Sequence, residues 1–388
     1  MYKELGVDSD KSDIAKTFDE VNDNDFPNAF CNMLTDPKNS DMLIIKHADG
    51  VGSKSVQRYL HYLQTGDKTI FQGDIFDAVS MNTGDIAAVG AVFCPYIATN
   101  TTAINAINVN KNLIKEQFAI GIKKIKELYR KYCFDFFWLG GETADLPDQT
   151  SSYILDVDIY TRVERQKAII GNVEHDDIIF GFSSGGRAIW EEKKNSGQMS
   201  NGLTMNRIAL MHSDYTKKYP FLFRNEAPCR GKYEVYDYLD DLGMTVSDAL
   251  TCPTRQWAIV VKMLIEELEK NNALHLLHGM CMNTGGGNTK IKNIGNNIKY
   301  VKILPKPLPL FRLVQSETGE SWKNMYQAQN MGIGFEVVGS AEGGFLKNAI
   351  EEVSKKTNVR SYLLGKCYNS PEDKNQVVLD TDYGIFEY

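Results

Sequence analysis

The stretch His47-Ala-Asp-Gly-Val-Gly-Ser-Lys54 constrains this chain more than any other, because it directly follows the apolar run at residues 42–45. Such a run is typical of a buried strand, and clustered glycines turn the backbone sharply where the strand ends. The strand would deliver Asp49 to a turn that ends at Lys54. A carboxylate there can hold a divalent cation, and a lysine can meet a phosphate.

Two more acids stand beside glycines, in Thr83-Gly-Asp85 and in Gly140-Gly-Glu142. We expect the first to break a helix predicted near residues 74–81, and the second to end a strand over residues 134–139. Taken singly, each of the three acids is more simply an ordinary turn residue. Taken together, Asp49, Asp85 and Glu142 predict one shared Mg²⁺-nucleotide site, since Mg²⁺ prefers oxygen ligands.

Three other glycine turns could present backbone N–H groups to a phosphate. They lie at Ser183, Ser184 and Gly185, at Ser200, Asn201 and Gly202, and at Gly285, Gly286 and Gly287. The simpler interpretation is a set of tight connections between strands and helices. No G-x-x-x-x-G-K-[ST] motif is present, which excludes a P-loop enzyme. Gly50 and Gly52 do not complete a dinucleotide-binding fingerprint either.

The remaining pattern alternates strands with helices. Strands are predicted at residues 95–108, 153–163, 178–182 and 331–338, with helices from Asn110, from residue 200, after Pro253 and over residues 341–353. Asn110 and a serine or asparagine at residues 200–201 are the expected N-caps. The strand, turn and helix series restarts near residue 170, so we expect an α/β fold of two domains, residues 1–170 and residues 171–388.

Composition narrows the function class. The 388 residues are 43% hydrophobic and 24% charged, as in ordinary globular proteins, and the net charge of −7 argues against a nucleic-acid platform. No apolar run is long enough to cross a bilayer, and no secretory segment opens the chain, so we expect a cytoplasmic protein. The seven cysteines form no C-x-x-C pair, which favours reduced, packed thiols. His278 precedes a glycine turn, but a structural role is the simpler interpretation.

These motifs, in this order, are where the chain resembles the phosphoribosylformylglycinamidine cyclo-ligase (aminoimidazole ribonucleotide synthetase) family. The resemblance covers most of the chain. Its segments are Tyr2-Lys-Glu-Leu-Gly-Val-Asp8, Asp49-Gly-Val-Gly-Ser-Lys54, Gly140-Gly-Glu-Thr-Ala-Asp145, Ser183-Ser-Gly185, Ser200-Asn-Gly202, Pro253-Thr-Arg255, Thr284-Gly-Gly-Gly287 and Gly332-Ile-Gly334. The set is typical of a wider ATP-using superfamily that includes thiamine-monophosphate kinase and selenophosphate synthetase.

The resemblance implies an N-terminal domain that pairs across a homodimer, with ATP bound near the dimer interface. The net charge and the lack of a long apolar run, in turn, predict no nucleic-acid or membrane partner. It implies ATP- and Mg²⁺-dependent ring closure of formylglycinamidine ribonucleotide. By position, Asp49, Asp85 and Glu142 would hold the metal. Gly50, Gly52, Ser53, Lys54, Gly140 and Gly141 would line the ATP site, with Lys54 and His278 as catalytic candidates. The Ser183, Ser200 and Gly285 turns would cradle the ribonucleotide phosphate.

The chain departs from the family pattern in three places. Residues 24–30 replace a glycine-rich loop, and the usual Asn-Asp pair is Gly84-Asp85, which leaves Asn82 as the nearby amide. The loop between the Ser183 and Ser200 turns is about a dozen residues longer, a kind of insertion that surface loops tolerate. Two alternatives therefore stay open: another ATP-using enzyme of the superfamily, or a nucleotide-binding module that has lost catalysis.

Overall fold

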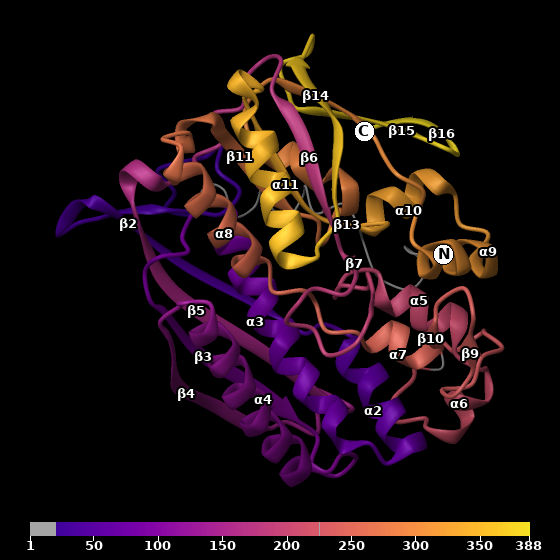
Figure 1. The fold of residues 1–388 in the computed structure, drawn as a ribbon. Coiled ribbons are helices and arrows are strands. Elements are labelled where there is room, and N and C mark those ends of the chain that lie inside the picture. Colours follow the sequence, from indigo (N-terminus) through magenta and orange to yellow (C-terminus); the bar gives the residue numbers. More distant parts are fainter. Residues whose placement is uncertain (1–20, 225) are drawn as a thin grey trace.

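The chain folds around two β-sheets (Figure 1). The structure, a computed structural model, describes residues 21–224 and 226–388. The motif at residues 2–8 lies outside this part. The predicted two-domain α/β fold class is confirmed, since one sheet takes its strands from residues 34–164 and the other from residues 178–387. The division at residue 170 itself stays a prediction.

The first sheet has five strands in the order β1-β2-β5-β3-β4. They are β1 (Leu34–Asp36), β2 (Asn39–Gly50), β3 (Tyr96–Ile104), β4 (Phe136–Asp145) and β5 (Tyr153–Glu164). Burial alternates along β5, so one face of the sheet is packed and the other is open. Helices α3 (Gln72–Ala87) and α4 (Lys111–Lys131) cover the packed face (Figure 1). As expected, the Asn110 side chain caps α4 by accepting from the Leu113 N–H.

The open face of this sheet carries large apolar side chains. Phe137, Leu139, Ile154 and Tyr160 are 49%, 69%, 48% and 37% exposed. Phe137 and Tyr160 flank Ile97 in neighbouring strands, so they form part of one surface. An apolar surface on an open sheet commonly marks a site of protein association.

The second sheet has seven strands in the order β11-β13-β6-β14-β12-β15-β16. They are β6 (Ile178–Ser183), β11 (Leu277–Met282), β12 (Ile298–Ile303), β13 (Ile333–Gly339), β14 (Ser361–Asn369), β15 (Gln376–Thr381) and β16 (Gly384–Glu387). All seven residues of β13 are buried. Helix α8 (Trp257–Lys270) lies on it through Trp257, whose ring stacks on Phe335, and α11 (Phe345–Thr357) packs beside α8.

Shorter elements connect the two sheets and flank them. The helices are α2 (Lys54–Thr65), α5 (Leu203–Leu210), α6 (Asp214–Lys218), α7 (Val246–Thr251), α9 (Pro309–Thr318) and α10 (Trp322–Ala328). The short strands are β7 (Gly185–Gly186), β8 (Asn195–Ser196), β9 (Tyr238–Leu239) and β10 (Met244–Thr245). No helix of residues 21–224 and 226–388 is long and apolar enough to span a bilayer.

Three local predictions were wrong. Helix α3 continues through Gly84 instead of breaking there, because Gly84 lets the helix approach Met282 of the second sheet closely. Strand β4 runs through Gly140 and Gly141 to Asp145, since pairing with β3 continues after a bulge. Helix α5 is preceded by Gly202 in the left-handed region, so neither Ser200 nor Asn201 caps it.

A fully buried charge network joins the two parts of the chain. Lys54 and Arg58 of α2 both pair with Asp77 of α3, and Arg58 also donates to Asp74 at 2.6 Å. Asp77 accepts from the backbone N–H of Thr254 at 2.8 Å, which ties α3 to the loop before α8. Burial alone would raise the pKa of Asp77, but the charges of Lys54 and Arg58 outweigh it and lower that pKa.

We predict that Asp77→Asn lowers the free energy of unfolding by about 3–5 kcal/mol, because two buried cations then lose a shared anion. Urea denaturation followed by circular dichroism measures the change. The matched control is Asp148→Asn, which alters an exposed carboxylate in the same half of the chain and should cost under about 0.5 kcal/mol. Equal free energies of unfolding for the two variants would contradict the proposed contribution of the network to stability.

Candidate functional site

Asp49 lies near the end of β2 and faces α3. His47, two residues earlier on the same strand face, reaches Asn82 of α3, with 2.9 Å between Nδ1 and the amide oxygen. The Asn82 amide nitrogen donates to the Asp49 backbone carbonyl at 3.0 Å. The Gly50 N–H donates to the Asp49 carboxylate at 2.7 Å. The strand end and the helix therefore hold Asp49 in a fixed position.

Asp85 comes to the same place from the last turns of α3. Its carboxylate lies 3.4 Å from His47 Nε2. Gly84 makes this approach possible, because a Cβ there would lie 2.3 Å from the sulfur of Met282, at the end of β11. The structure thus brings Asp49 and Asp85 together, although Asp85 sits in a helix and not in the predicted break.

The electrostatics of this cluster favour a bound cation. Burial would lower the pKa of His47, but its hydrogen bond to Asp85 and the Asp85 charge outweigh burial and raise it to about 9. Burial and the Asp85 charge raise the pKa of Asp49. Oδ1 of Asp85 is buried and has no hydrogen-bond partner. A half-buried carboxylate beside a buried one that has an orphaned oxygen forms an environment that favours positive charge.

The second sheet contributes Lys290, which stands after the glycine turn that follows β11. Its charge acts on Asp49 and lowers the raised pKa of that carboxyl in part. Its ammonium bonds the Thr284 hydroxyl at 3.2 Å and lies 5.4 Å from the ring centre of Phe30. The N–H groups of Gly285 and Gly286 make no hydrogen bond within the described part of the chain. An anion between Asp85 and this turn would meet a lysine and free donors.

These residues fit Mg²⁺ bound together with a polyphosphate. Mg²⁺ in such sites takes one or two carboxylates and completes its octahedron with water and phosphate oxygens. Asp49 and the unpartnered oxygen of Asp85 supply the carboxylates. In the described residues no cluster of three or more His, Cys, Asp or Glu side chains could hold a metal by itself. Phosphate oxygens would have to supply the rest.

Glu142 does not join this cluster within one chain. It pairs with Thr101 of β3, which pairs with Asp156 of β5, and these side chains lie on the open face of the sheet. Asp49 faces the packed side, and β2 lies three strand spacings, or about 14 Å, from β4. Gly140, at φ +100°, forms the bulge that turns Glu142 to the open face.

The Asp49 turn is placed differently from what its sequence suggested. Gly50 closes β2, and a Cβ there would clash with the Asp156 carboxylate. Gly52 is exposed, while the Ser53 hydroxyl bonds that of Thr204 at 2.8 Å. Lys54 is fully buried, and its ammonium donates to Asp77 and to the Cys252 carbonyl. Burial lowers the pKa of Lys54. In this conformation the ammonium is not open to a phosphate.

The three predicted phosphate turns meet around residues 328–330. Ser184 donates to the Asn330 side chain at 3.0 Å, and Asn201 donates to the Ala328 carbonyl at 3.0 Å. A Cβ added at Gly202 or at Gly287 would lie within 3 Å of Gln329 atoms, so both glycines pack closely against Gln329. Their convergence agrees with a shared ligand site, and the buried hydroxyl of Ser200 has no partner. The backbone N–H groups of the Ser183 turn are already used, because Ser183 donates to the Arg360 carbonyl, Ser184 to the Gly332 carbonyl and Gly185 to the Ser183 hydroxyl.

His278 stands at the far end of β11 from the glycine turn. It lies four positions before Met282, which corresponds to about 13 Å along a strand. Its Nδ1 bonds the Asp177 carboxylate at 2.7 Å, and this bond raises the pKa of His278. The geometry gives His278 a structural ion pair and leaves it distant from Asp49.

Two contributors escaped the sequence analysis. His47 lies two residues before Asp49, and this spacing places the two side chains on the same face of a strand. The spacing could have identified His47 from the sequence. Lys290 follows the triple-glycine turn by three residues, but only folding shows that this turn faces β2 and α3.

Comparison with known proteins agrees with the resemblance. No protein-family model matches the sequence. The chain is 27% identical over 342 residues to phosphoribosylformylglycinamidine cyclo-ligase of Methanocaldococcus jannaschii, covering 87% of this chain and 82% of the relative. It is 26% identical over 392 residues to the protein of that name from Brevibacillus brevis, covering 94% of each. These relatives are named as enzymes, and they confirm both the suspected family resemblance and the expectation of an enzyme.

Solved structures agree with the fold. Thiamine monophosphate kinase of Aquifex aeolicus has a TM-score of 0.51 at 14% identity, with 97% of this chain and 95% of that chain covered. Phosphoribosylformylglycinamidine synthase II of Thermotoga maritima has a TM-score of 0.55 at 12% identity, with 100% and 50% covered. A ThiL protein complexed with AMPPCP and TMP has a TM-score of 0.52 at 11% identity, covering 97% of this chain and 94% of that chain. At these identities the likeness concerns the fold alone.

We predict that His278→Gln lowers stability by about 1 kcal/mol at pH 6 and less at high pH. The Asp177 bond raises the folded-state pKa above the unfolded value of about 6.5. Its contribution is therefore complete below that value and is lost as the pH rises through the raised pKa. Urea unfolding at several pH values measures this. His275→Gln, an exposed change nearby, should show no such dependence, and a pH-independent loss in His278→Gln would argue against the ion pair.

Proposed function

We propose that this chain, similar over most of its length to phosphoribosylformylglycinamidine cyclo-ligases, catalyses the ATP-dependent closure of formylglycinamidine ribonucleotide to aminoimidazole ribonucleotide. The products would be ADP and phosphate, and the setting would be purine biosynthesis in the cytoplasm. The observation that carries the proposal is the Asp49–Asp85 pair, in which a buried oxygen of Asp85 has no partner and which lies near Lys290 and a glycine turn with free N–H groups.

In the proposed reaction, bound Mg²⁺-ATP supplies a γ-phosphoryl group that activates the amide oxygen, so that an internal nitrogen can displace phosphate. The contribution of this chain is to position and neutralise charge. Asp49 and Asp85 would hold the metal, His47 and Asn82 fix the two carboxylates, and Lys290 would face the phosphate oxygens.

The ribonucleotide phosphate would lie where the Ser183, Ser200 and Gly285 turns converge. The unpartnered Ser200 hydroxyl is a suitable donor for it. The Gly285 turn follows Met282 by three residues, and Met282 lies against Gly84, the neighbour of Asp85. One substrate could therefore extend from the turns toward the carboxylate pair.

We propose that a second copy completes the site. Strand β1 pairs only with residues 39–44 of β2, so the described chain leaves residues 45–50 without a neighbouring strand on that edge. Strand β4 is the other free edge. Pairing of each free β2 edge with the β4 edge of the partner would close the two sheets into a barrel. The barrel would bury the exposed apolar face and bring the partner's β4, the strand that carries Glu142, beside residues 45–50 of β2.

The runner-up is a small-molecule kinase, favoured only by the fold likeness to thiamine monophosphate kinase. The deciding assay supplies ATP, Mg²⁺ and formylglycinamidine ribonucleotide to the purified chain and follows the ring-closed product by mass spectrometry. A phosphorylated product without ring closure would favour the kinase. ATP binding without release of ADP would favour a module that has lost catalysis.

We predict that Asp49→Asn lowers turnover by at least about 100-fold, because one metal-binding charge is lost. The same should hold for Asp85→Asn. ADP release under saturating ATP measures the effect, and circular dichroism checks the fold. Asp214→Asn, an exposed helix acid, is the control and should retain activity. Near-normal turnover in Asp49→Asn would remove the proposed metal role.

We predict that mixing two inactive variants, Asp49→Asn and Glu142→Gln, restores activity if the site takes Glu142 from the partner subunit. In a heterodimer one site carries both changes and the other carries neither. After subunit exchange, about a quarter of wild-type activity is expected. No recovery, with exchange verified by mass spectrometry, would contradict the shared site. Phe137→Asp should in parallel shift the protein to monomer in sedimentation.

A further inference from the structure

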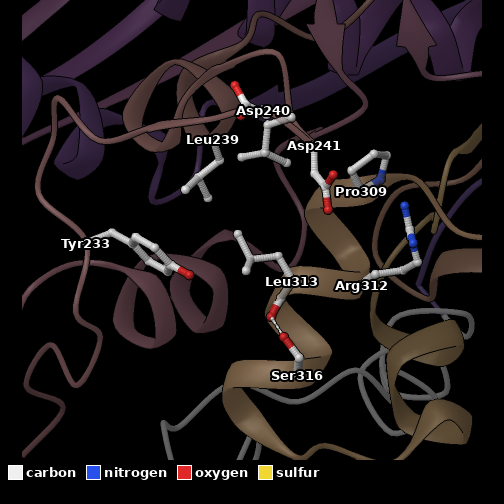
Figure 2. Close-up of a pocket in the computed structure, with 9 residues that line it drawn as sticks. Tyr233, Leu239, Asp240, Asp241, Pro309, Arg312, Leu313 and Ser316 are labelled. Carbon is white, nitrogen blue, oxygen red and sulfur yellow. Dashed lines mark hydrogen bonds between the residues drawn. The ribbon is translucent and has the colours of Figure 1, made fainter.

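A cavity lies away from the Asp49–Asp85 pair. It has a volume of about 410 Å³ and lies between the β9–β10 hairpin and α9 (Figure 2). Its walls are built from residues 233–242, a segment whose sequence suggested no role, and from residues 309–316. A cavity of this size suits a small molecule and not a nucleic acid or an extended peptide.

Hydrogen bonds and an ion pair hold the hairpin and the helix that form this cavity in fixed positions. Residues 240–243 form the tip of the hairpin, with Gly243 in the left-handed region and its N–H donating to the Leu239 carbonyl at 2.8 Å. Lys194 donates to the Leu242 carbonyl at 3.0 Å, which fixes the tip from outside. At the far side, Glu317 of α9 pairs with Lys232 at 2.9 Å. The cavity is therefore a built feature between two anchored elements.

In the described part of the chain, the charged side chains of this cavity make no ion pair with one another. Figure 2 shows the Asp241 carboxylate and the Arg312 side chain on the same side of the cavity, flanking Pro309. Nε of Arg312 is buried and has no hydrogen-bond partner. Within the described residues no ion pair joins Arg312 to Asp240 or Asp241. Asp241 is exposed and Arg312 is half-buried, so a ligand with one anionic and one cationic group would reach both the orphaned donor of Arg312 and the carboxylate of Asp241.

The rest of the lining is apolar. Leu239, Leu313 and the ring of Tyr233 face the same space, with Leu313 between Tyr233 and the charged pair (Figure 2). Two aspartates beside a single arginine disfavour a phosphorylated ligand, whose charge they would repel. A ligand with one anionic group, one cationic group and one apolar group would complement the arginine, the aspartates and the apolar side chains of the lining.

We propose that this cavity binds a free α-amino acid with an apolar side chain. Its carboxylate pairs with Arg312, which suits the forked guanidinium. Its ammonium group pairs with Asp241, and its side chain packs against Leu239 and Leu313. The site is separate from the proposed cyclo-ligase centre, so its occupancy can be measured without ATP or ribonucleotide.

Calorimetric titration of the full chain tests this with L-leucine as the probe. Two analogues each keep one charge: 3-methylbutylamine lacks the carboxylate, and 4-methylpentanoate lacks the ammonium. We expect L-leucine to bind at least about tenfold more tightly than either analogue, and more tightly than glycine, which lacks the side chain. Equal binding of L-leucine and the analogues, or no binding of L-leucine, overturns the proposal.

Variants locate the bound molecule. Arg312→Gln and Asp241→Asn should each weaken L-leucine binding by about tenfold. Their matched controls, Arg130→Gln and Asp148→Asn, alter exposed residues in the first half of the chain and should leave binding unchanged. Circular dichroism checks that each variant is folded. Unchanged binding in both cavity variants overturns the assignment to this cavity, and the analogue series decides the proposal even if a variant fails to fold.

Discussion

The position of α3 between the two sheets is the constraint on which the rest of the structure depends. Asp77, in the middle of this helix, carries two buried cations from α2 and a backbone N–H from the loop before α8. A buried carboxylate with these partners stays charged, and charged partners impose direction where apolar packing does not. These contacts therefore fix the rotation of α3 about its axis and its position along that axis, and they place its C-terminal end against β11.

The candidate site is a consequence of that placement. Asp85 is two helical turns beyond Asp77 on α3, so the network that fixes Asp77 also sets where Asp85 meets Asp49. Gly84 allows the contact with Met282, beyond which Lys290 and the glycine turn follow in the chain. A metal and phosphate site divided between two sheets needs this rigid spacing, because ligand positions must hold to a fraction of an ångström.

Charge placement also separates the two proposed ligand sites. Around Asp49 and Asp85, the opposing cations are His47 and Lys290, a balance that suits a metal and an anionic phosphate chain. In the cavity beside α9, Arg312 and Asp241 stand apart without pairing, which suits a single zwitterion. The two proposed sites therefore differ in chemistry as well as in place.

The sequence by itself determined the strand before Asp49, the helix capped by Asn110, the buried strand near residues 333–339 and the set of motifs that carry the family resemblance. These features depend on local periodicity and capping, which a short window contains. Tertiary structure alone decided that Asp85 belongs to a helix, that Lys54 is buried on Asp77, and that Glu142 faces away from Asp49. The physical reason is that packing across sheets and the bulge at Gly140 set which face a side chain occupies, and neither is encoded in neighbouring residues.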